Sequence, residues 1–137
     1  MIFTGDIQWV DCGNVYLGAK DDLLQFPGLD PLPGVYFFRL DDGKKTEVYI
    51  GETDNMKRRV AQYRNPGPSQ TTNINLNKLM KKYLKSGGSV TIHLMTLIKV
   101  KIDDKVIGSL DDKFFRCLLE NAAILHAIQE GDQLLNK

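Results

Sequence analysis

Two segments rich in aromatic and β-branched residues, separated by a tight turn, set the strongest limit on the fold of this chain. Residues 34–40 (GVYFFRL) and residues 47–51 (EVYIG) have the composition of strands. The intervening residues 41–44 (DDGK) are typical of a turn. The sequence therefore predicts an antiparallel hairpin, with Tyr36 and Tyr49 on neighbouring strands.

Three helices are predicted after the hairpin. Thr53 or Asp54 can cap the first, because their side-chain oxygens accept hydrogen bonds from free backbone amides, and the helix would run to about Arg64. The second is predicted from about Asn75 to Ser86, with apolar residues at helical spacing. A third strand over residues 90–100 precedes the last helix, which would begin at the capping-box-like residues 109–112 (SLDD) and end near Gln129.

This order of elements predicts an α+β fold, with a small three-stranded antiparallel sheet flanked by helices. The length of 137 residues suits one compact core. Residues 1–30 are only weakly periodic and lead into a turn-rich run, so we expect them to form an N-terminal arm or extension. Residues 31–137 would form the main domain.

Several classes of protein do not fit the sequence. Two cysteines, Cys12 and Cys117, are too few for a disulfide framework, and His93 and His126 lack the spacing of a zinc site. The chain has neither a signal-peptide pattern nor an apolar run of the roughly 20 residues that span a membrane. Glycine-rich nucleotide-binding motifs are absent. We therefore expect a cytoplasmic protein with no membrane contact and no organic cofactor.

Charge is distributed unevenly along the chain, although the net charge is only +1. Residues 1–43 have 2 basic and 7 acidic side chains, a net of −5, while residues 44–85 have 10 basic and 3 acidic, a net of +7. Residues 86–137 have 6 basic and 7 acidic, a net of −1. Because salt screens charges beyond about 10 Å, a polyanion would respond to the basic middle third. A merely soluble lysine-rich helix is the alternative.

Four side chains have residue types suited to phosphate chemistry. Tyr36 and Tyr49 lie on paired strands, where tyrosine is also common as a half-buried sheet residue. Arg59 and Tyr63 are four residues apart and share one face of a predicted helix. An arginine there could hold a phosphate through two parallel hydrogen bonds, or it could belong to a solvated basic face.

Glu120 is a carboxylate within an otherwise apolar helix segment. Such a group is costly to bury unless it pairs with a cation or binds a metal. Arg116 lies four residues earlier and is a possible ion-pair partner. Both interpretations stay open on the pattern alone.

Taken in order, these residues resemble the GIY-YIG nuclease superfamily. The tripeptide at 34–36 (GVY) matches the first family motif, and the tripeptide at 49–51 (YIG) matches the second after twelve intervening residues. The stretch 51–59 resembles the arginine helix of the family, with Arg59 at its catalytic position. Tyr63 replaces a histidine that many members carry, which resembles the excision-repair incision nucleases. The resemblance covers roughly residues 31–137.

The resemblance also implies a single metal-binding glutamate, matched by Glu120, and a late asparagine, similar to Asn136 but at longer spacing. It implies a stand-alone, metal-dependent DNA endonuclease, close to the restriction or phage endonuclease branches, that leaves a 5′-phosphate. Tyr36, assisted by Tyr49, would be the general base, and Arg59 would stabilise the pentacovalent phosphorus. Glu120 would hold one Mg²⁺ or Mn²⁺ ion per site.

Basic residues on the first two helices are expected to contact DNA phosphates without reading sequence. Those residues are Lys57, Arg58, Arg64, Lys78, Lys81, Lys82 and Lys85. Asparagines 73, 75 and 77 could read adenine edges, but Asn75 is better explained as a helix cap.

Two other functions remain open from the sequence. One is a non-catalytic nucleic-acid-binding module that keeps the nuclease fold. The other is a structural α+β domain in which Glu120 pairs with Arg116. A single active site cuts one strand, so double-strand cleavage would imply a homodimer or sequential nicking.

Overall fold

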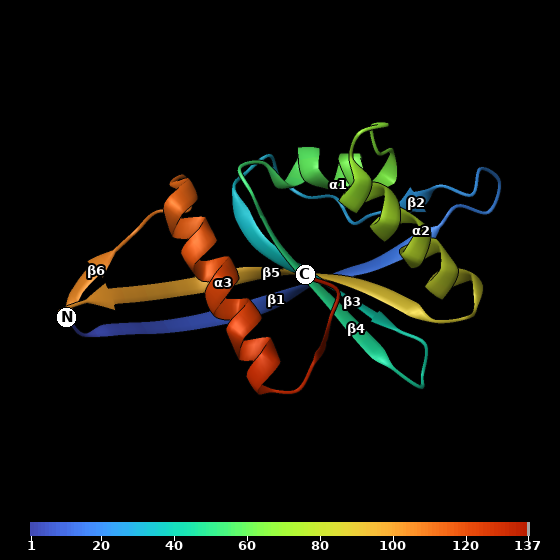
Figure 1. Cartoon of the computed structure of the whole chain (residues 1–137). Helices are drawn as coiled ribbons and strands as arrows, with labels where there is room; N and C mark the ends of the chain where they lie inside the picture. The colour runs from blue at the N-terminus through green and yellow to red at the C-terminus, as the bar shows by residue number, and fades with distance from the viewer. Residues whose placement is uncertain (137) are drawn as a thin grey trace.

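The computed structural model describes residues 1–136, apart from the side chain of Leu97. Figure 1 shows an α+β architecture in which three helices pack on one twisted sheet. The strands are β1 (Phe3–Leu17), β2 (Leu24–Gln25), β3 (Gly34–Asp41), β4 (Thr46–Thr53), β5 (Ser89–Ile102), β6 (Lys105–Ile107) and β7 (Gln133–Leu134). The helices are α1 (Met56–Arg64), α2 (Thr71–Lys85) and α3 (Lys113–Gln129).

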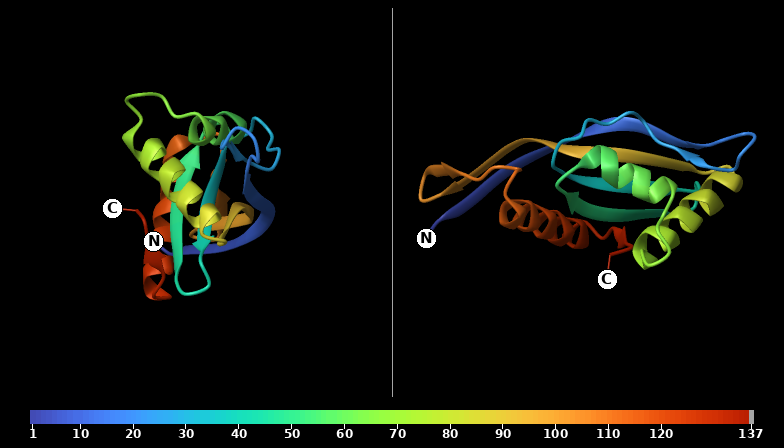
Figure 2. Two further views of the ribbon diagram at one scale, coloured as in Figure 1. Left: turned by 90° about the vertical axis from the view of Figure 1, so that its right-hand side faces the viewer. Right: turned by 90° about the horizontal axis from the view of Figure 1, so that it is seen from above.

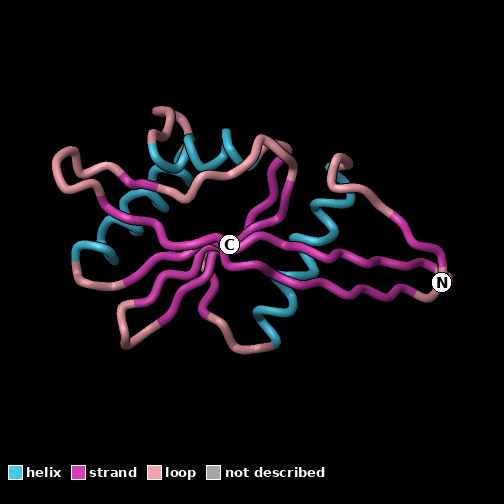
Figure 3. Tube along the Cα trace, turned by 180° about the vertical axis from the view of Figure 1, so that it is seen from behind, coloured by secondary structure: helices cyan, strands magenta, loops and turns pink. Residues whose placement is uncertain are grey.

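The sheet is built around β3, which pairs antiparallel with β4 on one side and β5 on the other. The strand order is β2-β1-β5-β3-β4-β7, with β6 paired to β5. The long β1–β5 pair extends beyond the rest of the sheet and ends at β6, as Figures 1 and 3 show. Helix α3 crosses the sheet at that end, and α1 and α2 lie toward the other (Figure 2).

The expected three-stranded sheet is wrong, because the sheet has seven strands. The largest difference lies in residues 1–30, expected to be an arm or extension. Their main part is β1, which pairs with β5 from Phe3 opposite Ile102 to Val15 opposite Val90. Most β1 residues are exposed or half-buried, so burial imposes no alternation of apolar and polar residues. The strand forms because β5 offers it a hydrogen-bonding edge.

The predicted hairpin is confirmed, with Tyr36 directly opposite Gly51 in the register of β3 and β4. The three helices are also present, with shifted starts. Helix α1 is capped by Asn55, whose side chain accepts a hydrogen bond from the Arg58 amide, rather than by Thr53 or Asp54. Helix α3 is capped by Asp112, whose carboxylate accepts from the amide of Phe114.

Helix α2 begins at Thr71, earlier than the predicted start at Asn75. Asn75 is therefore an exposed residue inside the helix and not its cap. The first turn is supported by Asn73, which donates to the side chain of Gln70 at 3.2 Å. Asn77 anchors the helix to the end of α1 by donating to the backbone oxygen of Tyr63 at 2.7 Å.

Alternate residues of β3 and β4 face different helices. Tyr36, Phe38 and Leu40 belong to the core beneath α1 and α2. Val35 belongs to the core beneath α3, while Ile50 packs in a third cluster with Ala127 of the same helix. This alternation, which follows from the pleat of a strand, decides which side chains of β4 can meet α1 and which can meet α3.

Gly51 allows an unusually close approach between its backbone and the ring of Tyr36. A Cβ atom added at Gly51 would lie 2.4 Å from the Tyr36 hydroxyl oxygen and 2.5 Å from Cζ. Tyr36 is buried and cannot swing away. We therefore expect Gly51→Ala to lower the free energy of unfolding by about 1–3 kcal/mol in urea denaturation, the usual cost of overpacking.

The matched control is Gly5→Ala on β1, where an added Cβ would have no neighbour within 4 Å. Its stability should change by no more than about 0.5 kcal/mol. Equal stability of the two variants would contradict the close approach at Gly51.

Candidate active site

Three tyrosines from three elements meet beneath α1. Tyr36 of β3 and Tyr63 of α1 are buried, and their hydroxyl oxygens lie 2.6 Å apart in a hydrogen bond. The hydroxyl of Tyr63 is also close enough to Tyr49 on β4 to lower the pKa of Tyr49. Tyr63 thus links the two motif tyrosines, and of the three only Tyr49 is partly exposed.

Burial dominates the acid–base properties of the cluster. It raises the pKa of Tyr36 well above the usual value for tyrosine, although the hydrogen bond with Tyr63 and the charge of Arg59 lower it. Burial likewise raises the pKa of Tyr63 and, at its more open position, of Tyr49. All three hydroxyls are therefore protonated at neutral pH, and each can donate a hydrogen bond.

Arg59 lies on the flank of α1 that faces these tyrosines. Its positive charge lowers the pKa of Tyr36, Tyr49 and Glu120, so it is close to all three. Its Nε atom is buried and has no hydrogen-bond partner in the part of the chain that the structure describes. A buried N–H without an acceptor is costly, and a phosphate oxygen would supply one.

Glu120 of α3 faces the same site from the other side of β4. Partial burial raises the pKa of its carboxyl, and the nearby charge of Glu52 raises it further. The nearby Glu52 backbone amide and the charge of Arg59 lower the pKa in turn. The ionised carboxylate is thus only partly compensated, and a bound cation would stabilise it.

Arg116 does not pair with Glu120. It is buried and donates instead from Nε to the Glu52 carboxylate at 2.8 Å and from Nη1 to the Leu110 backbone oxygen at 2.7 Å. The Arg116–Glu120 ion pair required by the structural-domain interpretation is therefore not formed. The Arg116–Glu52 pair ties α3 to β4 one helical turn before Glu120.

The site lies along the outer edge of β4, where pairing with β7 ends. The Leu135 amide donates to the Val48 backbone oxygen, and the Asn136 side chain then binds both backbone groups of Ile50, at 2.9 Å and 2.7 Å. Asn136 therefore continues the sheet edge as a strand would. The next edge amide, at Glu52, is the one that interacts with Glu120.

A cleft of about 470 Å³ opens beside Tyr49. It lies between the flank of α2 and the C-terminal segment, and its polar lining groups come from Tyr49, Thr71, Thr72, Asn75 and Asn136. Tyr49 is thus the tyrosine that a molecule in this cleft can reach.

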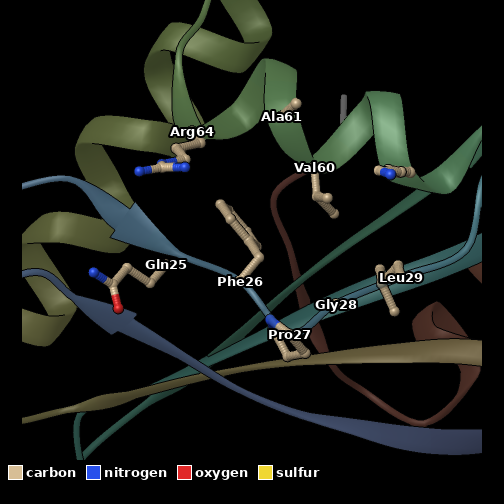
Figure 4. A pocket seen from close by; sticks show the side chains of 9 residues that line it. Gln25, Phe26, Pro27, Gly28, Leu29, Val60, Ala61 and Arg64 are labelled. Carbon is tan, nitrogen blue, oxygen red and sulfur yellow. The ribbon is translucent and has the colours of Figure 1, made fainter.

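The basic residues of α1 point away from this cleft. Lys57 and Arg64 line a separate pocket of about 330 Å³ between α1 and residues 25–29, shown in Figure 4. Arg58 forms an exposed ion pair with Asp54. On a helix with 100° per residue, these three side chains lie on different flanks from Arg59, so the structure separates them from the tyrosine cluster.

The lysines of α2 form one exposed group. Lys78, Lys81, Lys82 and Lys85 surround a shallow hollow of about 520 Å³ together with Ser86. Lys85 is also 3.0 Å from the carboxylate of Asp22. By contrast, Asn73 and Asn77 are buried and make hydrogen bonds within the protein, so they are not placed to read bases.

Glu52 is a site residue that the sequence did not single out, and Arg116, expected as a possible partner of Glu120, pairs with Glu52 instead. Glu52 follows the second tripeptide directly, and the alternation of β4 places it on the α3 side, opposite Tyr49. That alternation was a usable signal for Glu52. Its pairing with Arg116 depends on where α3 docks, which the sequence pattern does not reveal.

The described residues offer few side chains that could bind a metal ion together. They contain no group of three or more His, Cys, Asp or Glu side chains suited to a metal ion. Glu120, partly buried and without an ion pair in the described chain, fits a magnesium ion that keeps most of its water ligands. In the same residues, no helix has the length and apolar character needed to cross a membrane.

Comparison with known proteins adds information about the fold. Neither a protein-family profile nor a curated protein matches this chain. Among solved structures it is similar to a glutamate-to-alanine mutant of bacteriophage T4 EndoII, with a TM-score of 0.50 and 19% identity. The match covers 63% of this chain and 64% of that chain, slightly less than two thirds. At this identity the likeness shows a shared fold and nothing further.

The raised pKa of the Glu120 carboxyl predicts how a substitution at this position changes stability. A carboxyl with a raised pKa in the folded state destabilises that state once it is ionised, so the cost is present above its folded pKa. Glu120→Gln removes the charge and should raise Tm in EDTA at neutral pH by about 2–4 °C. Mn²⁺, added in large excess because a single carboxylate binds it weakly without DNA, should then raise the Tm of the wild type and not that of the variant.

Glu130→Gln is the control, since Glu130 is an exposed carboxylate at the end of α3. It should leave both Tm in EDTA and the response to Mn²⁺ unchanged. An equal Mn²⁺ response in wild type and Glu120→Gln would place the metal elsewhere.

Proposed function

We propose that this chain is a metal-dependent endonuclease that hydrolyses phosphodiester bonds in DNA. The observation that carries the proposal is the buried, unpartnered Nε of Arg59, next to three tyrosines and opposite the carboxylate of Glu120. Support also comes from the fold shared with bacteriophage T4 EndoII and from the motif order, which resembles the GIY-YIG nuclease superfamily. The proposal keeps the cytoplasmic location expected from the sequence.

Arg59 would bind the scissile phosphate and stabilise the negative charge that develops on it. The Nε atom of its guanidinium is already buried in the folded protein, so little reorganisation of that group is needed when the phosphate arrives. In the reaction, a water oxygen bonds to phosphorus as the bond to the leaving oxygen breaks. The water proton passes to a tyrosine phenolate, and solvent protonates the leaving oxygen.

Tyr49 is the best candidate to accept that proton. It is the one tyrosine of the cluster that lines the cleft, whereas Tyr36 and Tyr63 are buried behind it. Tyr36, proposed from the family resemblance as the general base, would act through Tyr63 by hydrogen bonding rather than by touching the water. Their hydroxyls can stabilise a Tyr49 phenolate as donors.

Glu120 would hold one Mg²⁺ or Mn²⁺ ion, which when bound supplies positive charge for the leaving oxygen. The backbone amide of Glu52 and the Arg116–Glu52 pair would keep the carboxylate at the edge of β4. Because a single carboxylate is a weak ligand set, we expect tight metal binding only when DNA phosphate is present.

Lys78, Lys81, Lys82 and Lys85 would contact the DNA backbone beside the cleft and make binding depend on salt. Lys57, Arg58 and Arg64 would contribute only if the duplex also follows the opposite flank of α1. We therefore expect the α2 lysines to matter more for affinity.

Nicking of supercoiled plasmid tests the proposed activity. With Mg²⁺ or Mn²⁺ we expect cutting that EDTA abolishes and that Glu120→Ala or Arg59→Ala lowers at least about 100-fold, a typical loss for one charge-stabilising group. Arg58→Ala, which removes a neighbouring exposed arginine, should retain activity within a few-fold. Salt-dependent DNA binding without cutting would favour the non-catalytic binding module. If the protein neither bound nor cut DNA, the nuclease and the binding module would both be contradicted.

The raised pKa of Tyr49 predicts how the rate depends on pH. Because the base must be deprotonated and its pKa lies above the usual value near 10, the phenolate fraction is small at neutral pH. The rate of cutting should therefore rise about tenfold per pH unit from about pH 7 to about pH 9. Tyr49→Phe should abolish this rise, while Tyr16→Phe, at an exposed position on β1, should not.

A plateau near neutral pH would contradict tyrosine as the base and favour a metal-bound water. Circular dichroism at each pH would show that the fold is retained.

A further inference from the structure

We propose that two copies of this chain associate through the outer face of α3. This helix has 17 residues and two apolar faces. The inner face packs on the sheet through Phe115, Leu119 and Ala127, which are buried. The outer face has no covering element in the described part of the chain, as Figures 1 and 2 show.

Four large apolar side chains on the outer face are exposed to solvent. Phe114 is 88% exposed, Leu125 67%, Ile128 59% and Leu118 37%. Isolated apolar residues on a surface need no explanation, but a continuous group of this kind marks a site of interaction. Leaving a phenylalanine and three aliphatic side chains in water on one helix has a cost that association would remove.

The spacing of these residues suits contact with another helix along the whole length of α3. Positions 114, 118, 121, 125 and 128 follow one another at intervals of four, three, four and three residues, the pattern of helices that pack side by side. Asn121 is the polar member of this row, and the row contains no charged residue. Single asparagines in such rows often determine the alignment of the two helices.

The row is nearly symmetric about Asn121, which favours a second copy as the occupant. An antiparallel pairing about a twofold axis at Asn121 would place Phe114 against the partner's Ile128 and Leu118 near the partner's Leu125. Such a contact is self-complementary, as a twofold interface must be. Antiparallel helices also oppose their dipoles, and Lys113 at one end would approach the partner's Glu130.

Asp111 and Asp112 near the start of α3 remain charged and would lie close to the partner's Glu130, which offsets part of the attraction from Lys113. The carboxylate of Asp112 is occupied in capping the Phe114 amide. Asp111 accepts a hydrogen bond from the Ser109 hydroxyl. Arg116 and Glu120 lie on the side that faces the sheet, where Arg116 is buried against Glu52.

The apolar surface is large enough for a modest interface. A large aromatic side chain buries roughly 150–250 Å². Four large apolar residues on each of two copies can therefore remove on the order of 1,000 Å² from water, the lower limit for a specific interface. We expect a reversible dimer that depends on protein concentration.

The pairing would leave both proposed active sites open, because Glu120 and the cleft beside Tyr49 lie away from the outer face. A dimer with two active sites could cleave both strands of a duplex. The association itself does not depend on nuclease activity and can be measured without DNA.

Sedimentation equilibrium of four proteins tests the proposal: the wild type, Leu125→Glu, Ile128→Lys and Val106→Glu. Val106 on β6 is 66% exposed, close to the 67% of Leu125, and is therefore a matched control. We expect the wild type and Val106→Glu to reach twice the chain mass with increasing concentration, and Leu125→Glu and Ile128→Lys to stay at one chain mass. Circular dichroism should show the same fold for all four.

Cross-linking locates the axis independently. With Cys12 and Cys117 replaced by serine, Asn121→Cys should form a disulfide-linked dimer under mild oxidation, and adding Leu125→Glu should prevent it. A monomeric wild type at all concentrations, or a dimer broken by Val106→Glu and not by Leu125→Glu, would overturn the proposal. Loss of nicking with dimerisation intact would overturn the proposed function alone.

Discussion

The ring of Tyr36 lies directly against the backbone of Gly51, and the arrangement of the site depends on this contact. It lets the hydroxyl of Tyr36 reach past β4 to Tyr63 on α1, where the two oxygens are 2.6 Å apart. Since Tyr63 and Arg59 are one turn apart on α1, this buried hydrogen bond also sets the rotation of the helix that presents the arginine.

The glycine that opens the first tripeptide has a related role. A Cβ at Gly34 would lie 3.2 Å from Cγ of Met56, the first residue of α1. The two glycines thus allow close packing at the two ends of one connection, from β3 through β4 to the start of the helix. Because both tripeptides contain a glycine at a tightly packed position, they help to place Tyr36, Tyr49 and Arg59 close together.

The site gathers around the edge of β4 rather than within a deep pocket. Tyr49 projects toward α1 and α2, whereas Glu52 projects toward α3, because successive side chains of a strand point to opposite faces. The Arg116–Glu52 pair holds β4 at Glu52, and the side-chain amide of Asn136 holds it at Ile50. Two groups at this edge remain poorly compensated: the buried Nε of Arg59, which has no partner among residues 1–136, and the partly buried carboxylate of Glu120. Residues kept in such environments are common at functional sites.

The sequence by itself determined the hairpin of β3 and β4, the existence of three helices, and the motif tyrosines and Arg59 that the structure brings close together. These features follow from short-range patterns: strand composition, turn chemistry and helical spacing. Only the tertiary structure decided that residues 3–17 form the longest strand. This segment has little alternation of apolar and polar residues, and it becomes a strand because it pairs with the edge of β5. The same holds for Arg116, which four-residue spacing alone would pair with Glu120. The docking of α3 brings Glu52 to it instead, since a buried guanidinium pairs with the carboxylate that packing places beside it.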